Sequence, residues 1–447
     1  MSSLKIGFSR IDITPDIGLD IAGYYVKRIS DGILDPLYAN AIAFECGDDR
    51  AVMIALDNLG IKQEILKKYR EKVTAATGVA LEGVFISCTH THTAPSAKAE
   101  VSDDVDAYIE LLAGLVVEAA KSALADLKTA KMGYGKGTAP GIAFVRRFRM
   151  KDGSIKTNPG VNNPDIVAPV GDVDESVSVL RFDREGADTV VFVSFGCHPD
   201  VVGGCKYSAD WPGFARSTVE KTLDGVKCVF FNGAEGDINH VNVHPTGGFL
   251  NGTFMDFDDV SRGYDHARYM GRVITGGVLQ AFDKVEYIDV DSISAVNRVI
   301  NVPSNKPTAE ELPEAHRIND LHLAGRDSEI PYSGMMLTTV VAEAARMVRL
   351  ENAPDAFDMT LSGIKIGDVA IVGIPGEPFL GIGKGIKEAD GYGMIIPVAC
   401  ANGYEGYFPM KDSYDEGGYE ARSSNFRAGV AEFIISESKH LLKEMND

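Results

Sequence analysis

The sequence predicts an α/β protein that folds as one unit around a largely buried β-sheet. Apolar runs typical of strands alternate with segments of helical periodicity along the 447 residues. No internal repeat and no low-complexity linker divides the chain. Length alone suggests roughly three domains. However, five predicted strands end in polar segments, and a site built from them would join residues 57 to 377 into one unit.

The predicted strands are short apolar runs bounded by polar or turn-forming residues. They cover Ala51–Leu56, Gly83–Cys88, Thr189–Phe195 and Lys227–Phe231. Ser362–Ile374 is predicted to form a β-hairpin, because Gly367-Asp368 supplies a turn between two apolar runs.

The predicted helices are longer and repeat their apolar residues at helical spacing. In Gln63–Thr77, for example, Leu66, Tyr69 and Val73 fall on one face. Further helices are predicted over Asp104–Leu127, Phe214–Leu223, Tyr264–Phe282, Met336–Leu350 and Asn425–Met445.

The charge of the chain argues against nucleic acid as a partner. The sequence has 44 Lys and Arg against 64 Asp and Glu, which gives a net charge of −20. DNA, RNA and anionic membrane surfaces attract basic proteins, and no run rich in Lys or Arg is present. We therefore expect a small-molecule substrate, no nucleic acid and no stable membrane association. A monomer and a homo-oligomer are both compatible with the sequence.

The N-terminus and the cysteines predict a cytoplasmic protein. The chain reaches charge at Lys5 before any apolar run of the secretory type develops. The six cysteines form no CxxC pair and are too few for a disulfide framework in a chain of this length. We expect them to be buried and reduced.

The polar segments that follow the strands are where chemistry is expected. In α/β sheets, ligands collect beyond the carboxyl ends of the strands. If the strands are parallel neighbours, all five segments line one pocket. The segments are Asp57-Asn58, Thr89–His92, Cys197–Asp200, Asn232–Asp237 and Gly373–Glu377.

Histidines stand in two of these segments. His90 and His92 are separated by one residue, so in extended backbone both imidazoles project to the same side. One could bind a metal while the other serves as a second ligand or as an acid/base, or both could be polar loop residues. His198 follows another apolar strand at the equivalent place. It adds support for a catalytic zinc, which takes several N, O or S ligands.

Glu377 and a tyrosine-rich segment are further candidates. Glu377 follows a Gly turn at a buried strand end, where a carboxylate is costly unless it is paired or bound to a metal. Alternatively, it complements the dipole of a following helix. Residues 402–420 contain four tyrosines and five carboxylates, and their composition alone predicts a surface loop.

Taken together and in order, several motifs resemble the neutral, non-lysosomal ceramidases, specifically their N-terminal catalytic domain. The motifs are Asp12-Ile-Thr-Pro15, Ala22-Gly-Tyr24, Thr89-His-Thr-His92, Arg146-Arg147, Ser208-Ala-Asp-Trp-Pro-Gly213, Pro375-Gly-Glu377 and the segment Asn402–Ala421. The resemblance extends over most of the chain. It implies a single catalytic domain over residues 1–447, built of multi-layer mixed β-sheets flanked by helices, without the C-terminal β-sandwich domain of the family.

The resemblance also implies a set of site residues. One Zn²⁺ per chain would be held by His90, His198, Glu377 and Tyr407. Around the scissile carbonyl, Arg146 and Tyr419 would donate to the oxyanion, and His92 would pass a proton to the leaving amine. Zinc would polarise the carbonyl and lower the pKa of a bound water.

One segment departs from the family. Gly236-Asp-Ile-Asn-His-Val241 places Asn239 where the family has a catalytically important serine. An amide cannot act as a nucleophile or release a proton near neutral pH, so this change counts against ceramide as the substrate. His240 and His244 in the same region could contact the metal ligands or bind a second metal, or they could be structural.

The leading hypothesis is therefore a zinc-dependent hydrolase that cleaves an amide bond in a small polar molecule, N-acylated or derived from a sugar. An esterase or lactonase with the same zinc site and a non-catalytic, zinc-stabilised binding protein are the alternatives. Specificity is expected to depend on the loops Asn242–Asp259 and Asn305–Ser333.

Overall fold

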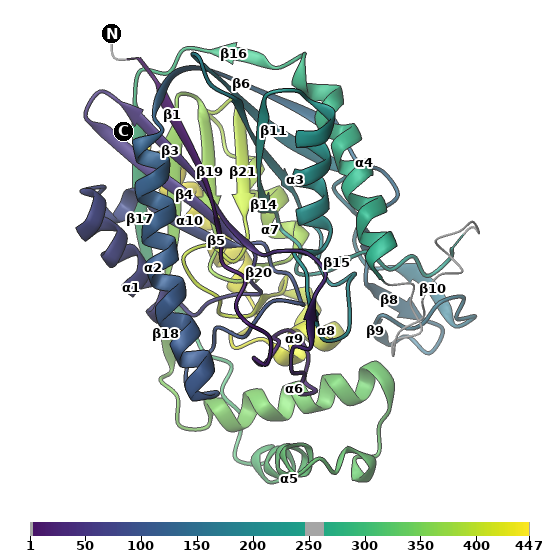
Figure 1. Ribbon diagram of the computed structural model, residues 1–447. Coiled ribbons are helices and arrows are strands. Elements are labelled where there is room, and N and C mark those ends of the chain that lie inside the picture. The colour runs from purple at the N-terminus through teal and green to yellow at the C-terminus, as the bar shows by residue number, and fades with distance from the viewer. Residues whose placement is uncertain (1–2, 246–262, 447) are drawn as a thin grey trace.

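Two β-sheets packed face to face form the centre of the molecule, and helices cover the outer face of each (Figure 1). The computed structural model describes residues 3–245 and 263–446. Between the sheets, Phe44 and Phe192 of the larger one pack in a single cluster with Ile364 and Ile371 of the smaller one. The predicted α/β class, with mixed sheets flanked by helices, is confirmed.

The larger sheet has nine strands and is mixed. In spatial order it contains β14 (Val226–Asn232), β12 (Thr189–Phe195), β11 (Ser176–Arg184), β6 (Lys128–Thr138), β1 (Lys5–Asp12), β3 (Tyr38–Cys46), β4 (Asp49–Leu56) and β5 (Val84–Cys88), and β16 (Glu286–Ile288) pairs with β6. Its outer face is covered by α1 (Gln63–Thr77), α2 (Asp103–Ala125), α3 (Asp210–Thr222) and α4 (Tyr264–Phe282).

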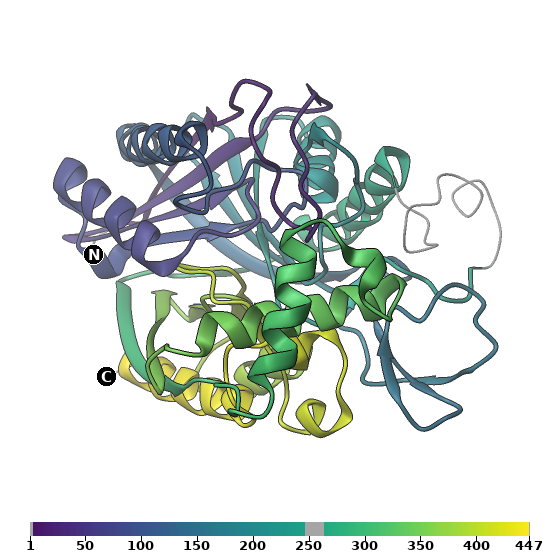
Figure 2. The ribbon, with the colours of Figure 1, turned by 90° about the horizontal axis from the view of Figure 1, so that it is seen from below.

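The smaller sheet has four strands, in the order β17 (Ile293–Pro303), β18 (Ala356–Ile366), β19 (Val369–Gly373) and β21 (Met394–Val398). Helices α7 (Leu380–Lys387) and α10 (Val430–Glu444) cover its outer face. Seen from below, α5 (Leu312–Leu323) and α6 (Gly334–Leu350) lie across the end of the molecule (Figure 2).

Short elements complete the chain. They are β2 (Gly32–Ile33), β7 (Phe144–Val145), β8 (Arg147–Met150), β9 (Ile155–Thr157), β10 (Ile166–Pro169), β13 (Lys206–Tyr207), β15 (Ile238–Asn239), β20 (Glu377–Pro378), β22 (Tyr407–Phe408), α8 (Asp412–Glu416) and α9 (Tyr419–Ser423). The segment 402–420, for which composition predicts a surface loop, therefore contains β22, all of α8 and the start of α9. Tyr407 and Glu420 in it are buried.

Strand β6 shows why sequence periodicity missed part of the larger sheet. Its sequence, KTAKMGYGKGT, has no apolar run. Glycine is needed there because α4 packs directly on the strand: a Cβ at Gly137 would lie 1.9 Å from the carbonyl oxygen of Gly277. Close helix packing thus replaces the side-chain pattern that normally indicates a strand.

The expectation that the strands carrying the polar segments are parallel neighbours is only partly right. The sheets are mixed, and the relevant strands form three separate parallel pairs, β4 with β5, β12 with β14, and β19 with β21. The third pair belongs to the smaller sheet. The segments still come together, because the face-to-face packing of the two sheets brings these strand ends to one place.

The two edge strands of the larger sheet also approach each other. Phe85 on β5 and Phe231 on β14 pack edge to face, with ring centroids 6.4 Å apart. The Asn232 side-chain amide then donates to the carbonyl oxygens of Thr89 and Cys197, at 3.2 and 3.1 Å. These contacts between the two edges of the sheet place the segment after β5 beside the segment after β12.

Three further expectations can be compared with the structure. All six cysteines are free, and five of them are buried while Cys205 is partly exposed. Of the described helices, none is long and apolar enough to cross a membrane. Residues 305–333 do not form a loop, since they contain α5, and most of the loop Asn242–Asp259 lies outside the described residues.

Asp57 supports the strand ends and is not among the residues that line the pocket beside the histidines described below. Its carboxylate accepts two hydrogen bonds from Arg216, at 2.8 and 2.5 Å, and one from the Tyr38 backbone N–H. Both partners of the ion pair are buried. Removing one partner of such a pair leaves a buried charge without compensation.

We predict that Arg216→Met lowers the free energy of unfolding by about 3–5 kcal/mol, measured by chemical denaturation. Arg317→Met is the matched control, because its ion pair with Glu314 is exposed, and it should leave the midpoint nearly unchanged. Equal midpoints for the two variants would contradict a structural role for the Asp57 pair.

Candidate functional site

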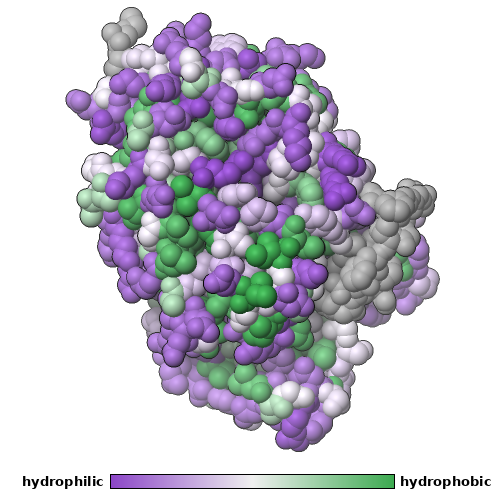
Figure 3. Space-filling view, in the orientation of Figure 1, coloured by the Kyte–Doolittle hydropathy of each residue, from purple (hydrophilic) through white to green (hydrophobic). Residues whose placement is uncertain are grey.

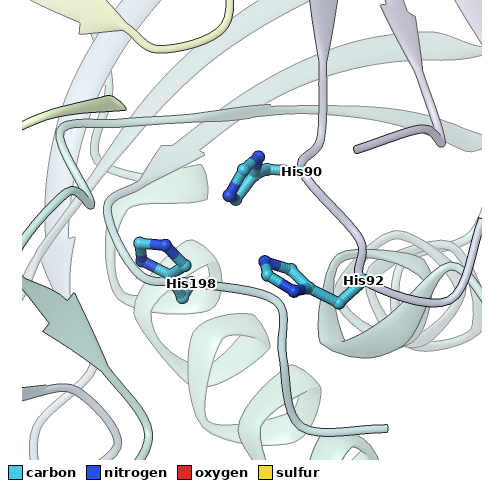
Figure 4. A group of neighbouring side chains, drawn as sticks. All are labelled: His90, His92 and His198. Atoms are coloured by element: carbon cyan, nitrogen blue, oxygen red, sulfur yellow. The ribbon is translucent and has the colours of Figure 1, made fainter. Parts of the chain in front are cut away.

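Three histidines from two separate segments face one another at the strand ends (Figure 4). His90 and His92 follow β5, and His198 follows β12. The ring centroid of His90 lies 5.0 Å from that of His92 and 5.0 Å from that of His198. All three side chains are buried. The three rings therefore lie together at the strand ends, and of the three only His92 is among the residues that line the pocket described below.

The expectation that His90 and His92 project to the same side because their backbone is extended is wrong. His90 has a φ of 74° and is in the left-handed region, not in extended backbone. Its amide N–H donates to the carbonyl oxygen of Asn58, and that of His92 donates to Pro199. The segment therefore turns at His90, and hydrogen bonds to two other strand-end segments hold it.

Glu377 and Tyr407 are placed side by side by a two-residue parallel pairing. Glu377 on β20 is in register with Tyr407 on β22. Glu377 Oε2 lies 2.9 Å from His198 Nε2 and 3.4 Å from His90 Nε2, and the Tyr407 hydroxyl lies 3.4 Å from His198 Nε2. The four residues that the family resemblance implied as ligands thus converge.

The alternative role for Glu377, as a carboxylate at a helix N-terminus, does not fit the contacts. Helix α7 begins at Leu380, and the backbone N–H of Leu380 donates to Asp237 Oδ1 at 2.8 Å. Asp237 therefore caps this helix. Glu377 instead accepts a hydrogen bond from the Tyr404 hydroxyl at Oε1, 2.6 Å away.

The hydrogen bonds behind the rings determine which imidazole nitrogen carries the proton. His90 Nδ1 lies 2.7 Å from the Leu59 carbonyl oxygen, and His198 Nδ1 lies 2.8 Å from that of Glu235. A carbonyl only accepts, so each Nδ1 carries the hydrogen and each neutral ring has its lone pair on Nε2. Burial lowers the pKa of His198, which favours the neutral ring.

In these tautomers Nε2 of His90 and Nε2 of His198 face the Glu377 carboxylate, and the Tyr407 hydroxyl lies 3.4 Å from His198 Nε2. His90 Nε2 is buried and has no hydrogen-bond partner among the described residues. Two lone pairs facing a carboxylate repel one another unless a proton or a metal ion lies between them. Zinc fits this donor set of imidazole, carboxylate and phenol groups. The separations of 2.9–3.4 Å between these atoms are close to the roughly 3.3 Å between ligands around a tetrahedral zinc.

A second group of potential ligands lies behind His90. Cys400 Sγ is 3.6 Å from His90 Nδ1 and 3.8 Å from Glu235 Oε1, and all three side chains are buried. This group uses the nitrogen of His90 that donates to Leu59, so a metal there would have to displace that hydrogen. Burial also raises the pKa of both Cys400 and Glu235 well above their usual ranges, which favours a neutral thiol and a neutral acid.

A small pocket of about 120 Å³ opens beside the histidine cluster. Its described lining includes His92, Arg146, Tyr407 and Tyr419, which were all implied by the family resemblance. Neither ring nitrogen of His92 has a hydrogen-bond partner among the described residues. Burial lowers the pKa of His92 to about 3, although Asp200 raises it in part, so the ring is neutral.

The motif Ala22-Gly-Tyr24 brings the N-terminal segment against the ring of His92, beside the pocket. Gly23 has a φ of 105°, and a Cβ at this position would lie 2.6 Å from His92 Nδ1. Only glycine allows the chain to pass this close to the ring. The neighbouring Tyr24, Tyr25 and Val26 line the pocket.

Arg146 is a fixed cation in the wall of the pocket. It donates to the Gly236 carbonyl at 2.6 Å, its Nε lies 2.6 Å from Glu420 Oε1, and its Cζ lies 5.2 Å from the Tyr407 ring centre. Burial on its own would lower the pKa of Arg146, but Tyr407 and Glu420 raise it above its usual value. Tyr419 packs edge to face on Tyr407, 5.5 Å away, and burial raises its pKa.

Asn239 lies behind a residue that lines the pocket and does not line the pocket itself. It is buried but is not among the described residues that line the pocket. Its Nδ2 donates to Asn158 Oδ1 at 3.0 Å, and its Oδ1 accepts from the Val241 N–H. Asn158, which sequence reasoning did not single out, lines the pocket instead.

The other histidines of this region lie apart from the cluster. His240 is buried with its ring centroid 5.5 Å from that of His266, and His244 is exposed. Neither belongs to a candidate metal group within the described part of the chain. Sequence reasoning missed Tyr404, Asn158, Glu235 and Cys400, because no spacing rule connects them to His90 or Glu377.

We predict that Glu377→Gln stabilises the metal-free protein by about 1–3 kcal/mol, because an amide N–H can donate to the facing Nε2 lone pairs. The same variant should lose most of the thermal stabilisation that zinc gives the wild type. Melting temperatures after chelation and after zinc addition measure both effects. If Glu377→Gln were less stable than the wild type without metal, the inferred repulsion would be wrong.

The comparisons with known proteins agree on the fold. No family model matches the sequence, and no curated protein sequence matches it significantly. The structure is similar to that of neutral ceramidase from Pseudomonas aeruginosa, with a TM-score of 0.72 and 18% identity over 100% of this chain and 75% of that one. It is also similar to a ceramidase complexed with C2, with a TM-score of 0.71 and 17% identity over 100% of this chain and 76% of that one. The chain therefore has a ceramidase-like fold.

Proposed function

We propose that the protein is a zinc-dependent hydrolase that cleaves an amide bond in a small polar substrate. The observation that carries the proposal is the convergence of two imidazole Nε2 atoms on a buried carboxylate, next to a pocket lined by a third imidazole whose ring nitrogens make no hydrogen bond to the described residues. The ceramidase-like fold agrees with amide hydrolysis.

His90, His198, Glu377 and Tyr407 are the residues that would hold the ion. Zinc bound there supplies a Lewis acid for the carbonyl oxygen and makes water nucleophilic at neutral pH. The phenol of Tyr407 has a pKa raised by burial, so in the metal-free protein it is protonated. Tyr404 orients Glu377 by its hydrogen bond to Oε1.

His92 is positioned to carry the proton. Water attack forms a C–O bond and releases a proton, and breaking of the C–N bond requires a proton on the leaving nitrogen. A neutral imidazole with both nitrogens available can accept the first proton and deliver it to the second position. Negative charge that develops on the carbonyl oxygen favours the protonated ring, which offsets the low pKa that burial gives His92.

Arg146 and Tyr419 stabilise the developing oxyanion. Arg146 stays charged, and its contacts with Gly236 and Glu420 fix the guanidinium before the reaction begins. Tyr419 keeps its hydroxyl proton because burial raises its pKa. Donors that are fixed in advance in a buried site stabilise developing charge without reorganisation.

The alternative of a non-catalytic zinc protein explains fewer contacts. A structural zinc needs ligands, and it does not need His92, Arg146 and Tyr419 around a pocket beside them. A buried imidazole that makes no hydrogen bond through its ring nitrogens is costly to a fold, which favours its retention for chemistry.

We predict that His92→Ala keeps its zinc but lowers kcat by about 10²–10⁴-fold. Zinc content by mass spectrometry and turnover of N-acetylated amines, with the matching acetate esters in parallel, measure this. His240→Ala is the control, because that buried histidine lies outside the cluster. A wild type that binds zinc and turns over neither class, or a His92→Ala protein as active as the wild type, would contradict the proposal.

A further inference from the structure

The outer wall of the pocket comes from helix α6, which the family resemblance did not involve. Met335 and Thr338, near the start of this helix, line the same pocket as His92 and Asp200. Tyr25 and Val26 also line it. Hydrophobic residues gather in the central and lower part of the face shown in Figure 3, where Figure 1 draws the N-terminal segment. In that segment Val26 is 58% exposed.

Side-chain contacts attach helix α6 to the segment that carries Tyr419. Arg422 on α9 donates to Glu343 on α6 at 2.9 Å, and Arg349 on α6 donates to Asn425 at 2.6 Å. Helix α9 begins at Tyr419, one of the proposed oxyanion donors. The position of α6 is therefore coupled to the position of Tyr419.

Helix α5 supports α6 from outside. Ala315 and Ile318 of α5 pack with Val341 and Ala344 of α6 in a cluster of their own. A helix held by a separate apolar cluster on one side and by an ion pair and a charged hydrogen bond on the other is a stiff boundary. In Figure 2 the pair crosses in front of the sheet ends.

The pocket lining combines polar and apolar side chains. His92, Asp200 and Asn158 are among the polar ones, and Met335 and Val26 are apolar. The leaving amine needs its proton from His92. The acyl group is the apolar part of the substrate, so it belongs against Met335 and Val26. The volume of about 120 Å³ is well below the roughly 300–1,000 Å³ of pockets that enclose drug-sized ligands.

We propose that Met335 and Thr338 determine specificity by limiting the acyl group to a short chain, so that the substrates are amides of short carboxylic acids. This inference rests on the proposed amide hydrolysis at the same site. Met335 is only partly buried, which makes its replacement by a smaller residue compatible with folding. Met336, the next residue, is 38% exposed and does not line the described pocket. It therefore allows an identical substitution as a control.

The test compares wild type, Met335→Ala and Met336→Ala, each loaded with zinc and checked for an unchanged melting temperature. Binding of acetohydroxamate, butyrohydroxamate, hexanohydroxamate and octanohydroxamate is measured by calorimetry. Turnover of the corresponding anilides is measured in the same proteins. Binding reports the size of the pocket independently of hydrolysis.

For the wild type and Met336→Ala, Kd should rise at least about tenfold from butyrohydroxamate to octanohydroxamate. In Met335→Ala this difference should shrink by about tenfold, and kcat/KM for the anilides should follow. The inference is overturned if the wild type prefers octanohydroxamate, if none of the hydroxamates binds, or if the two methionine variants behave alike. If the binding profile holds but no anilide is cleaved, the proposed hydrolysis fails while the short-chain wall stands.

Discussion

The site depends on the hydrogens that His90 and His198 carry on Nδ1. The carbonyl oxygens of Leu59 and Glu235 accept from Nδ1 of His90 and His198, and this fixes both Nε2 lone pairs toward the Glu377 carboxylate. Three electron-rich atoms so close together in a buried place repel one another unless a cation joins them. A divalent metal bound between these atoms would remove the repulsion between the two Nε2 lone pairs and the carboxylate. Imidazole and carboxylate donors favour zinc as that metal.

The arrangement of the two sheets brings the site residues together. Three parallel strand pairs, in two sheets that pack face to face, send their carboxyl ends to one place. The Asn232 amide joins the two edges of the larger sheet by bonding the carbonyls of Thr89 and Cys197. The short pairing of β20 with β22 adds Glu377 and Tyr407. Strand register thus positions Glu377 and Tyr407, whereas hydrogen bonds to neighbouring strand-end segments position His90 and His198.

The sequence allowed the buried strands and long helices to be predicted, because apolar runs and helical periodicity are local properties. Gln63–Thr77 and Tyr264–Phe282 are helices with the predicted bounds. Strand β6 was missed because glycines and close helix packing replace the apolar pattern. Among the site residues, His90 and His198 stood out by their place after strands, whereas Tyr407 came only from the family resemblance. Tyr404 and Asn158 could not be predicted, since register and side-chain contact decide their roles.

The central claim is that zinc binds in an environment of imidazole and oxygen ligands at His90, His198, Glu377 and Tyr407. X-ray absorption spectroscopy of the zinc-loaded protein at the zinc edge tests it most directly. We predict one ion per chain, two imidazoles and only nitrogen or oxygen at about 2.0–2.2 Å. A sulfur ligand at about 2.3 Å would place the metal at Cys400 behind His90, and it would contradict the assignment.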